Sequence, residues 1–399
     1  MIINDVRALA YTAQIGSVMP IAGADNIELV TIGGWTCIAK KGEFKENDYC
    51  VYFEIDSKLP ETAEWAAFLA PKKFKVKTMK LSKFGVISQG LALPYTAFTG
   101  IDLPNKIHQD ITELLGVTYC DAEDNKRKAN SEDKYKKMVQ RRPDIFKKAW
   151  AKWFMRREWG RKLMFAFFGK KKDKKSGWPV GQFPGVSKTD QERVENMPWV
   201  LQNKEPYIVT QKCDGSSGTY ILERKPFGRY EFYVCSRNVR MLNGKQECFY
   251  GDHNYYWEVA EKYQIEKRMK QYLADNPNVK WVCWQGEICA PGIQKNPHKL
   301  TDTHFYCFHW TDSLNGRLDI LTAADLWGKY QMDVVPVVDT NYIMPDTLEE
   351  LKLTADGYYD SRVCGKGETK CRREGFVYYK VSDPTFSFKN VSREYLLRH

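Results

Sequence analysis

The sequence predicts an α+β protein built from three successive parts. Short apolar segments separated by glycine turns fill the first part, a strongly basic segment with helical periodicity follows, and strands alternate with helices in the rest. With 399 residues, of which 43% are hydrophobic, the chain is long enough for two or three domains with separate cores. We place the predicted domains at residues 1–115, 116–180 and 181–399.

The composition excludes several classes of protein. No N-terminal stretch has the pattern of a signal peptide, and no apolar run reaches the roughly 18 residues needed to cross a bilayer. We therefore expect a soluble, cytoplasmic protein without a membrane partner. The eleven cysteines are scattered, without a Cys-x-x-Cys pair or a zinc-like Cys/His group, so we expect reduced core residues.

The first part is typical of a small β-barrel of the OB type. Strands are expected at 27–32, 35–40 and 49–55, separated by turn signals such as Gly33-Gly34. Strict alternation over 73–78 predicts one further strand with three lysines on one face: Lys73, Lys75 and Lys77. Such a face suits a nucleic-acid backbone, although lysines also protect edge strands from aggregation.

The middle part carries the positive charge of the protein. Residues 126–175 hold 20 basic and 5 acidic residues, a net charge of +15 against +11 for the whole chain. Over 143–168, aromatic residues recur at helical spacing and basic residues fill the remaining arc, which predicts a basic amphipathic helix. This helix has three open interpretations: a solvated face, a nucleic-acid clamp or a membrane-surface contact. The basic face consists of Lys147, Lys148, Lys152, Arg156 and Arg157.

The third part is expected to be a mixed domain of strands and helices. Thr189 or Asp190 is expected to cap a short helix over 188–193. A longer helix is predicted over 255–273, and 311–374 is mostly polar with helical patches. Strands are predicted at 209–212, 231–237, 280–288, 304–310, 375–380 and 386–390.

One of these strands ends in the sequence Lys212-Cys213-Asp214-Gly215. Alone, this pattern indicates only a strand end and a turn, and Cys213 has no nearby histidine that would make it a nucleophile. In order along the chain, however, six elements resemble the motifs of the nucleotidyltransferase superfamily of ATP-dependent ligases and capping enzymes. They are the Lys212 sequence, Arg237, Glu287, Phe308, Glu374 and Lys389.

Within that superfamily the chain resembles the Deinococcus-type RNA ligases, which seal nicks in duplexes. The resemblance extends over nearly the whole chain, through GWxxxAKKGE in the first part and FPxxxxKTDxERxxN at 183–196. It implies an OB-like barrel followed by an ATP-grasp-like nucleotidyltransferase domain. The sequence departs from the usual pattern at Gln211, His309 and Ser387.

The resemblance also implies the chemistry of individual residues. Lys212 would carry AMP as a phosphoramidate, formed from ATP with Mg²⁺ or Mn²⁺. Burial and the neighbouring cations Lys389, Arg237 and a bound Mg²⁺ would first lower the pKa of Lys212. Glu287 would bind the ribose and Phe308 would stack on adenine. Glu374 would hold the metal through water, and Asp214 would orient either the ribose or the metal, the latter through water. Further cofactor contacts are expected from Gln211, Gly215 and Lys380.

The expected partner is a nicked RNA duplex or an RNA/DNA hybrid, and the expected state is a monomer. Two other functions remain possible on the same fold. One is a capping-type guanylyltransferase, which would use GTP, and the other is a non-catalytic RNA- or DNA-binding protein. A covalent label from ATP, from GTP or from neither nucleotide distinguishes the three.

Overall fold

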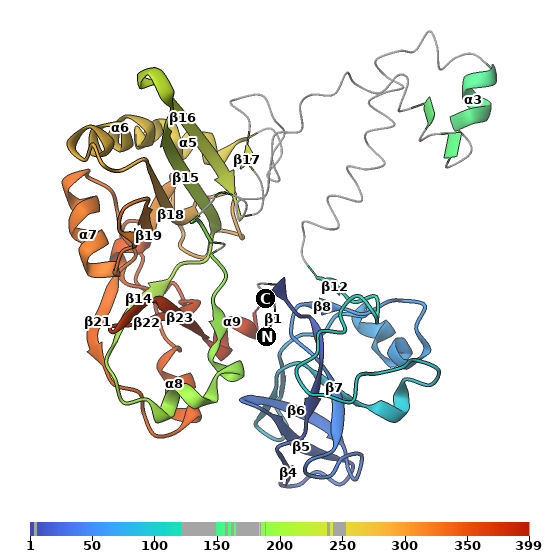
Figure 1. The fold of residues 1–399 in the computed structure, drawn as a ribbon. Coiled ribbons are helices and arrows are strands. Elements are labelled where there is room, and N and C mark those ends of the chain that lie inside the picture. The colour runs from blue at the N-terminus through green and yellow to red at the C-terminus, as the bar shows by residue number, and fades with distance from the viewer. Residues whose placement is uncertain are drawn as a thin grey trace. The chain divides into compact units, whose positions relative to one another are not determined.

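The structure is a computed structural model (Figure 1). It describes residues 1–3, 6–120, 149–155, 159–160, 163–164, 183, 185–187, 189–237, 240–241 and 253–398, with only the backbone at 149, 150 and 152. The chain divides into two compact units, one formed by Met1–Thr118 with Trp178–His399 and the other by Tyr119–Gly177. The predicted domain boundaries at 115 and 180 stay a prediction.

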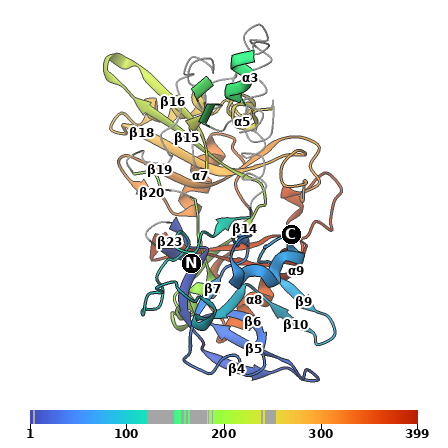
Figure 2. The ribbon, with the colours of Figure 1, turned by 90° about the vertical axis from the view of Figure 1, so that its right-hand side faces the viewer.

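The N-terminal module, residues 1–118, is built mainly from short antiparallel strands. Two three-stranded sheets form its centre, in the orders β11-β7-β3 and β4-β5-β6 (Figure 2). Tyr52 packs against Tyr11 and Trp35, with ring centroids 5.3 and 5.8 Å away. The strands are β1 (Ile2–Ile3), β2 (Val6–Arg7), β3 (Ala10–Gln14), β4 (Ser17–Pro20), β5 (Ile27–Ile32), β6 (Trp35–Lys40), β7 (Tyr49–Phe53), β8 (Ser57–Lys58), β9 (Met79–Leu81), β10 (Val86–Ser88), β11 (Leu91–Pro94) and β12 (Thr118–Tyr119).

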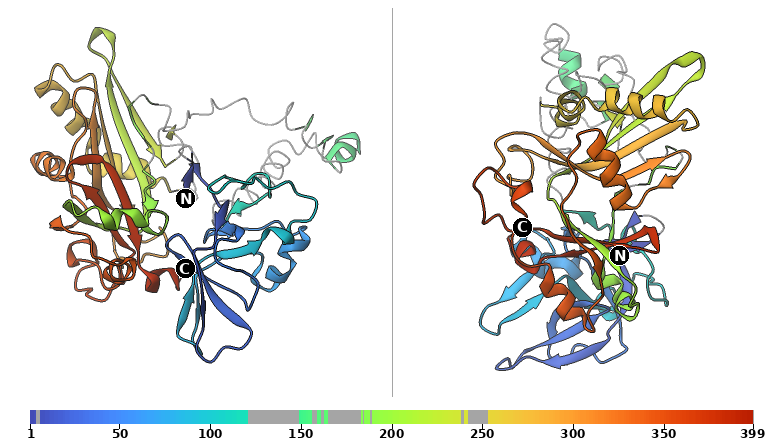
Figure 3. Two further views of the ribbon diagram at one scale, coloured as in Figure 1. Left: turned by 60° about the horizontal axis from the view of Figure 1, so that its bottom comes forward. Right: turned by 90° about the vertical axis from the view of Figure 1, so that its left-hand side faces the viewer.

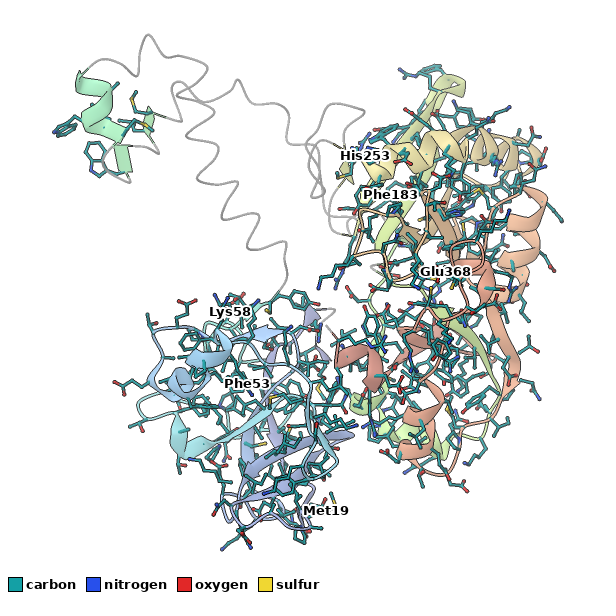
Figure 4. The ribbon with its side chains drawn as sticks, turned by 180° about the vertical axis from the view of Figure 1, so that it is seen from behind. Met19, Phe53, Lys58, Phe183, His253 and Glu368 are labelled. Carbon is teal, nitrogen blue, oxygen red and sulfur yellow. The ribbon has the colours of Figure 1, made fainter. Side chains whose placement is uncertain are left out.

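Three of these twelve strands were predicted from the sequence, because they combine apolar residues with clear turn signals at their ends. The predicted strands 27–32 and 35–40 have the bounds of β5 and β6, and 49–55 is shortened to β7. Phe53 lies fully buried inside the module, whereas Met19 on β4 is 39% exposed (Figure 4).

The strand predicted over 73–78 is wrong. The 3-10 helix η1 (Glu64–Lys72) ends there, and Lys73 and Phe74 both take left-handed backbone conformations, with φ of 53° and 59°. The amides of these two residues close the helix end on Ala70 and Leu69, which an extended strand could not do. Consequently Lys73, Lys75 and Lys77 do not share the face of a strand.

The second unit contains helix α3 (Ala149–Met155). Aromatic rings meet edge to face within this unit, with centroids 5.0 Å apart for Trp153 and Phe154 and 5.4 Å apart for Phe154 and Trp159. The predicted basic helix is therefore confirmed over these seven positions. Lys147, Lys148, Arg156, Arg157 and the side chain of Lys152 lie outside the described residues.

The C-terminal domain, residues 189–398, is organised around two sheets. The five-stranded sheet has the order β13-β23-β22-β14-β21, and the six-stranded sheet has the order β17-β16-β15-β18-β19-β20. The strands of the first are β13 (Glu192–Arg193), β14 (Tyr207–Lys212), β21 (Val337–Tyr342), β22 (Gly375–Lys380) and β23 (Asp383–Val391). Those of the second are β15 (Ser216–Arg224), β16 (Tyr230–Ser236), β17 (Arg240–Met241), β18 (Trp281–Cys289), β19 (His304–Asp312) and β20 (Gly316–Arg317).

Helices α5 (Tyr255–Lys262), α6 (Ile265–Asp275) and α7 (Ile320–Lys329) cover one side of the six-stranded sheet, as the gold and orange helices show (Figure 3). Their apolar stripes pack on Trp284 and Trp310 in the largest core of the domain. Two shorter helices, α8 (Leu348–Thr354) and α9 (Arg393–Leu396), accompany the five-stranded sheet.

Three local expectations for this domain need correction. The helix predicted over 255–273 is two helices, because Gln264 takes a left-handed conformation with φ of 48° and ends the first. Within the described residues 189–193 there is no helix that Thr189 or Asp190 could cap, since 189–191 are irregular and β13 begins at Glu192. Strand β21 was missed because it is an edge strand whose side chains are largely exposed, so it lacks the alternation of a half-buried strand.

Asn196 joins the N-terminal module to the segment before β14. Its side-chain oxygen accepts hydrogen bonds from Trp35 Nε1 at 2.6 Å and from the Tyr11 hydroxyl at 3.2 Å. Its amide nitrogen donates to Glu54 at 3.0 Å and to Glu192 at 2.8 Å. Asn196 therefore links strands of the module to β13, the strand that pairs with β23.

The cysteines agree with the expectation of reduced core residues. Ten cysteines among the described residues are free thiols, and nine of them are buried. In the part of the chain that the structure describes, every helix is too short or too polar to cross a membrane.

Candidate active site

The sequence Lys212-Cys213-Asp214-Gly215 carries the chain from one sheet of the C-terminal domain to the other. Lys212 is the last residue of β14, and β15 begins at Ser216. A side chain at Gly215 would place its Cβ 2.3 Å from the Ile288 carbonyl oxygen. Glycine is therefore needed because the turn lies directly against β18.

Three carboxylates surround the Lys212 amine. Lys212 pairs with Gly375 across the sheet, so Glu374 lies beside the lysine, and Nζ is 2.8 Å from Glu374 Oε2. Glu287 on β18 is opposite Ser217 on β15, just after the turn. Asp214 belongs to the turn itself and is only 9% exposed. The structure thus brings together acidic residues that are far apart in the sequence, Asp214 and Glu374 being separated by 160 positions.

The carboxylates decide the protonation state of Lys212. Burial alone would lower the pKa of Lys212, but attraction to Glu374 and Glu287 outweighs burial and raises the pKa above its ordinary value. Lys212 is therefore a charged partner of Glu374, and the lowering of its pKa by Lys389, Arg237 and a bound Mg²⁺ stays a prediction.

The same cluster holds more negative charge than one ammonium group balances. Burial raises the pKa of Glu287 to about 8 and that of Asp214 to about 7, with repulsion from Glu374 adding to both. The cluster is therefore suited to an additional cation.

Lys389 lies on the same face of the five-stranded sheet as Lys212. It is opposite Val377, which is opposite Thr210, and Thr210 and Lys212 are two residues apart on β14. Burial, followed by repulsion from Arg193 and Lys212, lowers the pKa of Lys389 to about 7. The side-chain amine of Lys389 makes no hydrogen bond or ion pair with the described residues. An anionic ligand would therefore meet an available amine.

Arg237 follows β16 and forms a two-point contact with Asp190. The distances are 2.5 Å from Nη2 to Oδ1 and 3.1 Å from Nε to Oδ2. Attraction to Arg237 and then Lys389 lowers the pKa of Asp190 despite its burial. Asp190 is thus part of the site, although sequence reasoning treated it only as a possible helix cap.

Phe308 is brought to the same region by an irregularity in β19. Gln285 is opposite His309 and Gly286 is opposite Cys307, so Phe308 is the extra residue of a β-bulge. Its ring packs on the cluster that contains Cys213, next to Lys212. The bulge re-aims an aromatic side chain that strict alternation would place differently.

Two expected cofactor residues are not brought to Lys212. The side chain of Gln211 alternates to the opposite face of β14, where its Oε1 accepts a hydrogen bond from the Asp360 amide at 2.9 Å. Lys380 is opposite Tyr207, at the other end of β14, and its Nζ lies 3.1 Å from Glu205.

Two residues that contact Asp214 were missed by sequence reasoning. The Asp214 amide donates to His298 Nε2 at 3.2 Å, and the Tyr395 hydroxyl donates to Asp214 Oδ2 at 2.5 Å. Neither residue belongs to a local motif, and no signal in the sequence connects them to Asp214.

The donor set fits a divalent cation that is only partly coordinated by protein. Among the described residues, no three His, Cys, Asp or Glu side chains converge closely enough to hold a metal by themselves. Mg²⁺ commonly uses one or two carboxylates, with water and substrate phosphates completing the shell. Asp214 and Glu374 are the residues that would supply these oxygens.

Replacing Lys389 by methionine is expected to stabilise the nucleotide-free protein by on the order of 2 kcal/mol at pH 6, because it removes a buried cation. The folded-state pKa of about 7 lies below the ordinary 10.5. The full free-energy cost of burying the charged amine therefore lowers the stability of the fold below pH 7, and this cost declines as the pH rises toward 10.5. Urea unfolding at pH 6 and pH 9 should therefore show a larger gain at pH 6.

Lys380→Met is the matched control on the neighbouring strand. It removes one end of a surface ion pair, which usually contributes less than about 1 kcal/mol. An equal stabilisation by both substitutions, or a gain for Lys389→Met that does not depend on pH, would contradict the assignment of a buried amine.

Comparison with known proteins agrees with this geometry. An OB-fold domain profile matches residues 9–95, and an RNA ligase family profile matches residues 205–391. A search of curated proteins gave no match.

Three solved structures of Naegleria gruberi RNA ligase are similar along the whole chain. The ligase with pyrophosphate has a TM-score of 0.71 and 29% identity, covering 99% of both chains. A lysine-to-alanine variant with ATP and Mn has the same score and identity, covering 99% of this chain and 98% of that one. An apo aspartate-to-alanine variant, with a TM-score of 0.71, is 30% identical over 99% and 98% of the two chains. The chain therefore consists of an N-terminal OB-fold domain and a nucleotidyltransferase domain, and it belongs to the RNA ligase family.

Proposed function

We propose that this chain is an ATP-dependent ligase that seals breaks with a 3′-hydroxyl and a 5′-phosphate, in particular nicks in duplexes that carry a 3′-ribonucleotide. The observation that carries the proposal is the placement of Lys212 among three carboxylates, with Lys389 on the same face of the sheet. A lysine nucleophile, oxygen donors for a cation and a cation for phosphate are the groups that nucleotidyl transfer requires.

ATP is the proposed nucleotide, with Mg²⁺ or Mn²⁺ as the metal. The similar ligase from Naegleria gruberi was solved with ATP and Mn and with AMP and Mn. In this chain, Phe308 is the aromatic residue near the nucleophile that could stack on adenine, and Glu287 is the acidic residue that could bind the ribose.

In the first step, Lys212 Nζ attacks the α-phosphorus of ATP, a P–N bond forms, and the P–O bond to pyrophosphate breaks. Lys212 must first lose a proton, which the three neighbouring carboxylates oppose. A divalent ion held by Asp214 and Glu374 would supply positive charge that offsets these carboxylates and the α-phosphate. Lys389 and Arg237 would bind the phosphates from the other side.

In the second step, AMP passes from Lys212 to the 5′-phosphate of the nucleic acid. In the third, the 3′-hydroxyl attacks that phosphate and expels AMP, which joins the strands. Both steps require the polyanion to be held beside the site. We assign this holding to the N-terminal module and to the basic segment, on the basis of the OB-fold match and the charge of 126–175.

Incubation with α-³²P-ATP is expected to label the protein covalently, and Lys212→Arg is expected to abolish the label. Arginine keeps the positive charge beside Glu374 but remains protonated, so it cannot attack phosphorus. Lys380→Arg, at the end of β22 opposite Tyr207, is the control and should label normally. Label from GTP instead would favour a guanylyltransferase, and label from neither nucleotide would favour a binding protein.

A panel of nicked duplexes tests the substrate. We expect efficient sealing when the 3′-hydroxyl strand ends in a ribonucleotide, on an RNA or a DNA template, and slower sealing of an all-DNA nick by about tenfold or more. The measurement is the single-turnover rate of pre-adenylated enzyme on each duplex. Equal sealing of the all-DNA nick would contradict the assignment to RNA.

Two positively charged surfaces are the proposed contacts to the nucleic-acid backbone. In the N-terminal module, Lys73 and Lys77 are exposed and Lys75 is partly buried, in the irregular segment after η1. In the second unit, the surface is the basic face of the helix that the sequence predicts over 143–168, of which the structure describes α3. The two surfaces are proposed separately because each belongs to a different unit.

Reversing Lys147, Lys148, Lys152, Arg156 and Arg157 to glutamate is expected to weaken nick binding and to flatten its dependence on salt. The slope of log K against log salt should become shallower by about 0.9 for each phosphate that the protein no longer neutralises. Labelling of Lys212 by ATP should not change. Reversal of the exposed Lys267, Lys270 and Lys329 on α6 and α7 is the control. Unchanged binding at several salt concentrations would rule out the clamp.

A further inference from the structure

The segment that follows Lys389 returns to the carboxylates beside Lys212. Ser392, immediately after β23, donates its backbone amide to the Glu374 carbonyl oxygen at 2.8 Å. Helix α9 then begins, and the Tyr395 hydroxyl donates to Asp214 Oδ2 at 2.5 Å. One short segment therefore contacts the residues that contribute two of the three carboxylates.

Asp214 and Glu374 are also connected through His298 and Tyr359. The amide of Asp214 donates to His298, whose ring lies 4.2 Å from the ring of Tyr359 at an interplanar angle of 30°. The Tyr359 hydroxyl in turn accepts a hydrogen bond from the Glu374 amide at 3.1 Å. His298 is itself fixed by Nδ1, which lies 2.9 Å from the Val363 carbonyl oxygen. The contacts thus form a closed ring around Asp214 and Glu374.

Helix α9 is held firmly enough to fix the direction of Tyr395. The Ser392 hydroxyl accepts a hydrogen bond from the Tyr395 amide at 3.2 Å and donates to Asp356 at 2.6 Å. Glu394 on the same turn pairs with Arg372 at 2.5 Å. Because the helix has only four residues, these contacts hold it, not its own hydrogen bonds.

The Asp214 carboxylate needs such a donor. It is almost fully buried, and a buried carboxylate without hydrogen bonds is costly. The Tyr395 hydroxyl supplies such a donor, at 2.5 Å from Asp214 Oδ2. Repulsion from Glu374 would otherwise favour rotation of Asp214 away from its neighbour.

We propose that Tyr395 is a positioning residue for the adenylation step, which holds the Asp214 carboxylate in the orientation that Lys212 and its nucleotide require. The inference rests on the proposed ligase function and adds a residue outside the motif set. Tyr395 touches Asp214 and acts through it, so its removal should slow the reaction without preventing ATP binding.

The test compares Tyr395→Phe with the unmodified protein in single-turnover adenylation over a range of ATP concentrations. We expect a rate at saturating ATP lower by about tenfold, the effect of losing one hydrogen bond to a charged group, and a KM for ATP changed by less than about twofold. The melting temperature should fall by no more than a few degrees, because one hydrogen bond is lost while the ring and its packing are kept.

Arg393→Met is the matched control on the same helix. It removes a surface ion pair with Glu349 and leaves the Tyr395 hydroxyl in place, so adenylation should stay within about twofold of the unmodified rate. A similar loss of rate in both variants would show that α9 matters only for folding and would overturn the proposal. An unchanged rate for Tyr395→Phe would overturn it as well.

A double-substitution cycle separates an action through Asp214 from a general effect. Tyr395→Phe added to Asp214→Asn should slow the residual adenylation by less than about twofold, because the neutral amide no longer needs a charge-assisted donor. A full tenfold loss in that background would overturn the proposal. Failure of the unmodified protein to become labelled by ATP would instead contradict the proposed function, before any question about Tyr395 arises.

Discussion

The ion pair between Lys212 and Glu374 is the contact on which the site depends, and sheet register creates it. Strands β14 and β22 are antiparallel, with Lys212 opposite Gly375, so Glu374 is the neighbour of the lysine. A slip of one residue would turn Lys212 to the opposite face and move it away from Lys389. The pairing of two strands thus fixes the nucleophile, its acidic partner and the second lysine together.

The charges of the site are divided between two ends. Asp214, Glu287 and Glu374 form an acidic end, while Lys389, Arg193 and Arg237 form a basic end. A nucleoside triphosphate that carries a divalent ion has the complementary arrangement, with anionic phosphates and a cation side by side. Burial raises the pKa of Glu287 and lowers that of Lys389, and the proposed ligand would supply each of them with a partner of opposite charge.

The segment from Glu192 to Asn196 serves both the N-terminal module and the nucleotidyltransferase domain. Arg193 pairs in parallel with Lys389 at the sheet edge, and Asn196 bonds to Trp35 and Tyr11 in the module. Gly34 donates its amide to the Glu195 carbonyl oxygen at 2.7 Å, and a Cβ at Gly34 would lie 2.7 Å from that residue. The backbones of Gly34 and Glu195 therefore lie in direct contact, which leaves no room for a side chain at position 34.

The sequence by itself determined three strands of the N-terminal module, most of the longer strands of the C-terminal domain and the basic segment, and it singled out Lys212, Glu287, Glu374 and Lys389 as candidates, because apolar runs and ordered motifs are local properties. Only the tertiary structure decided their environment. It placed carboxylates around Lys212, moved Gln211 and Lys380 away from it, and replaced the expected strand over 73–78 by a helix end. It also brought His298 and Tyr395 to Asp214 from 84 and 181 residues away. Such contacts depend on register and on side-chain packing between distant segments, which no local pattern encodes.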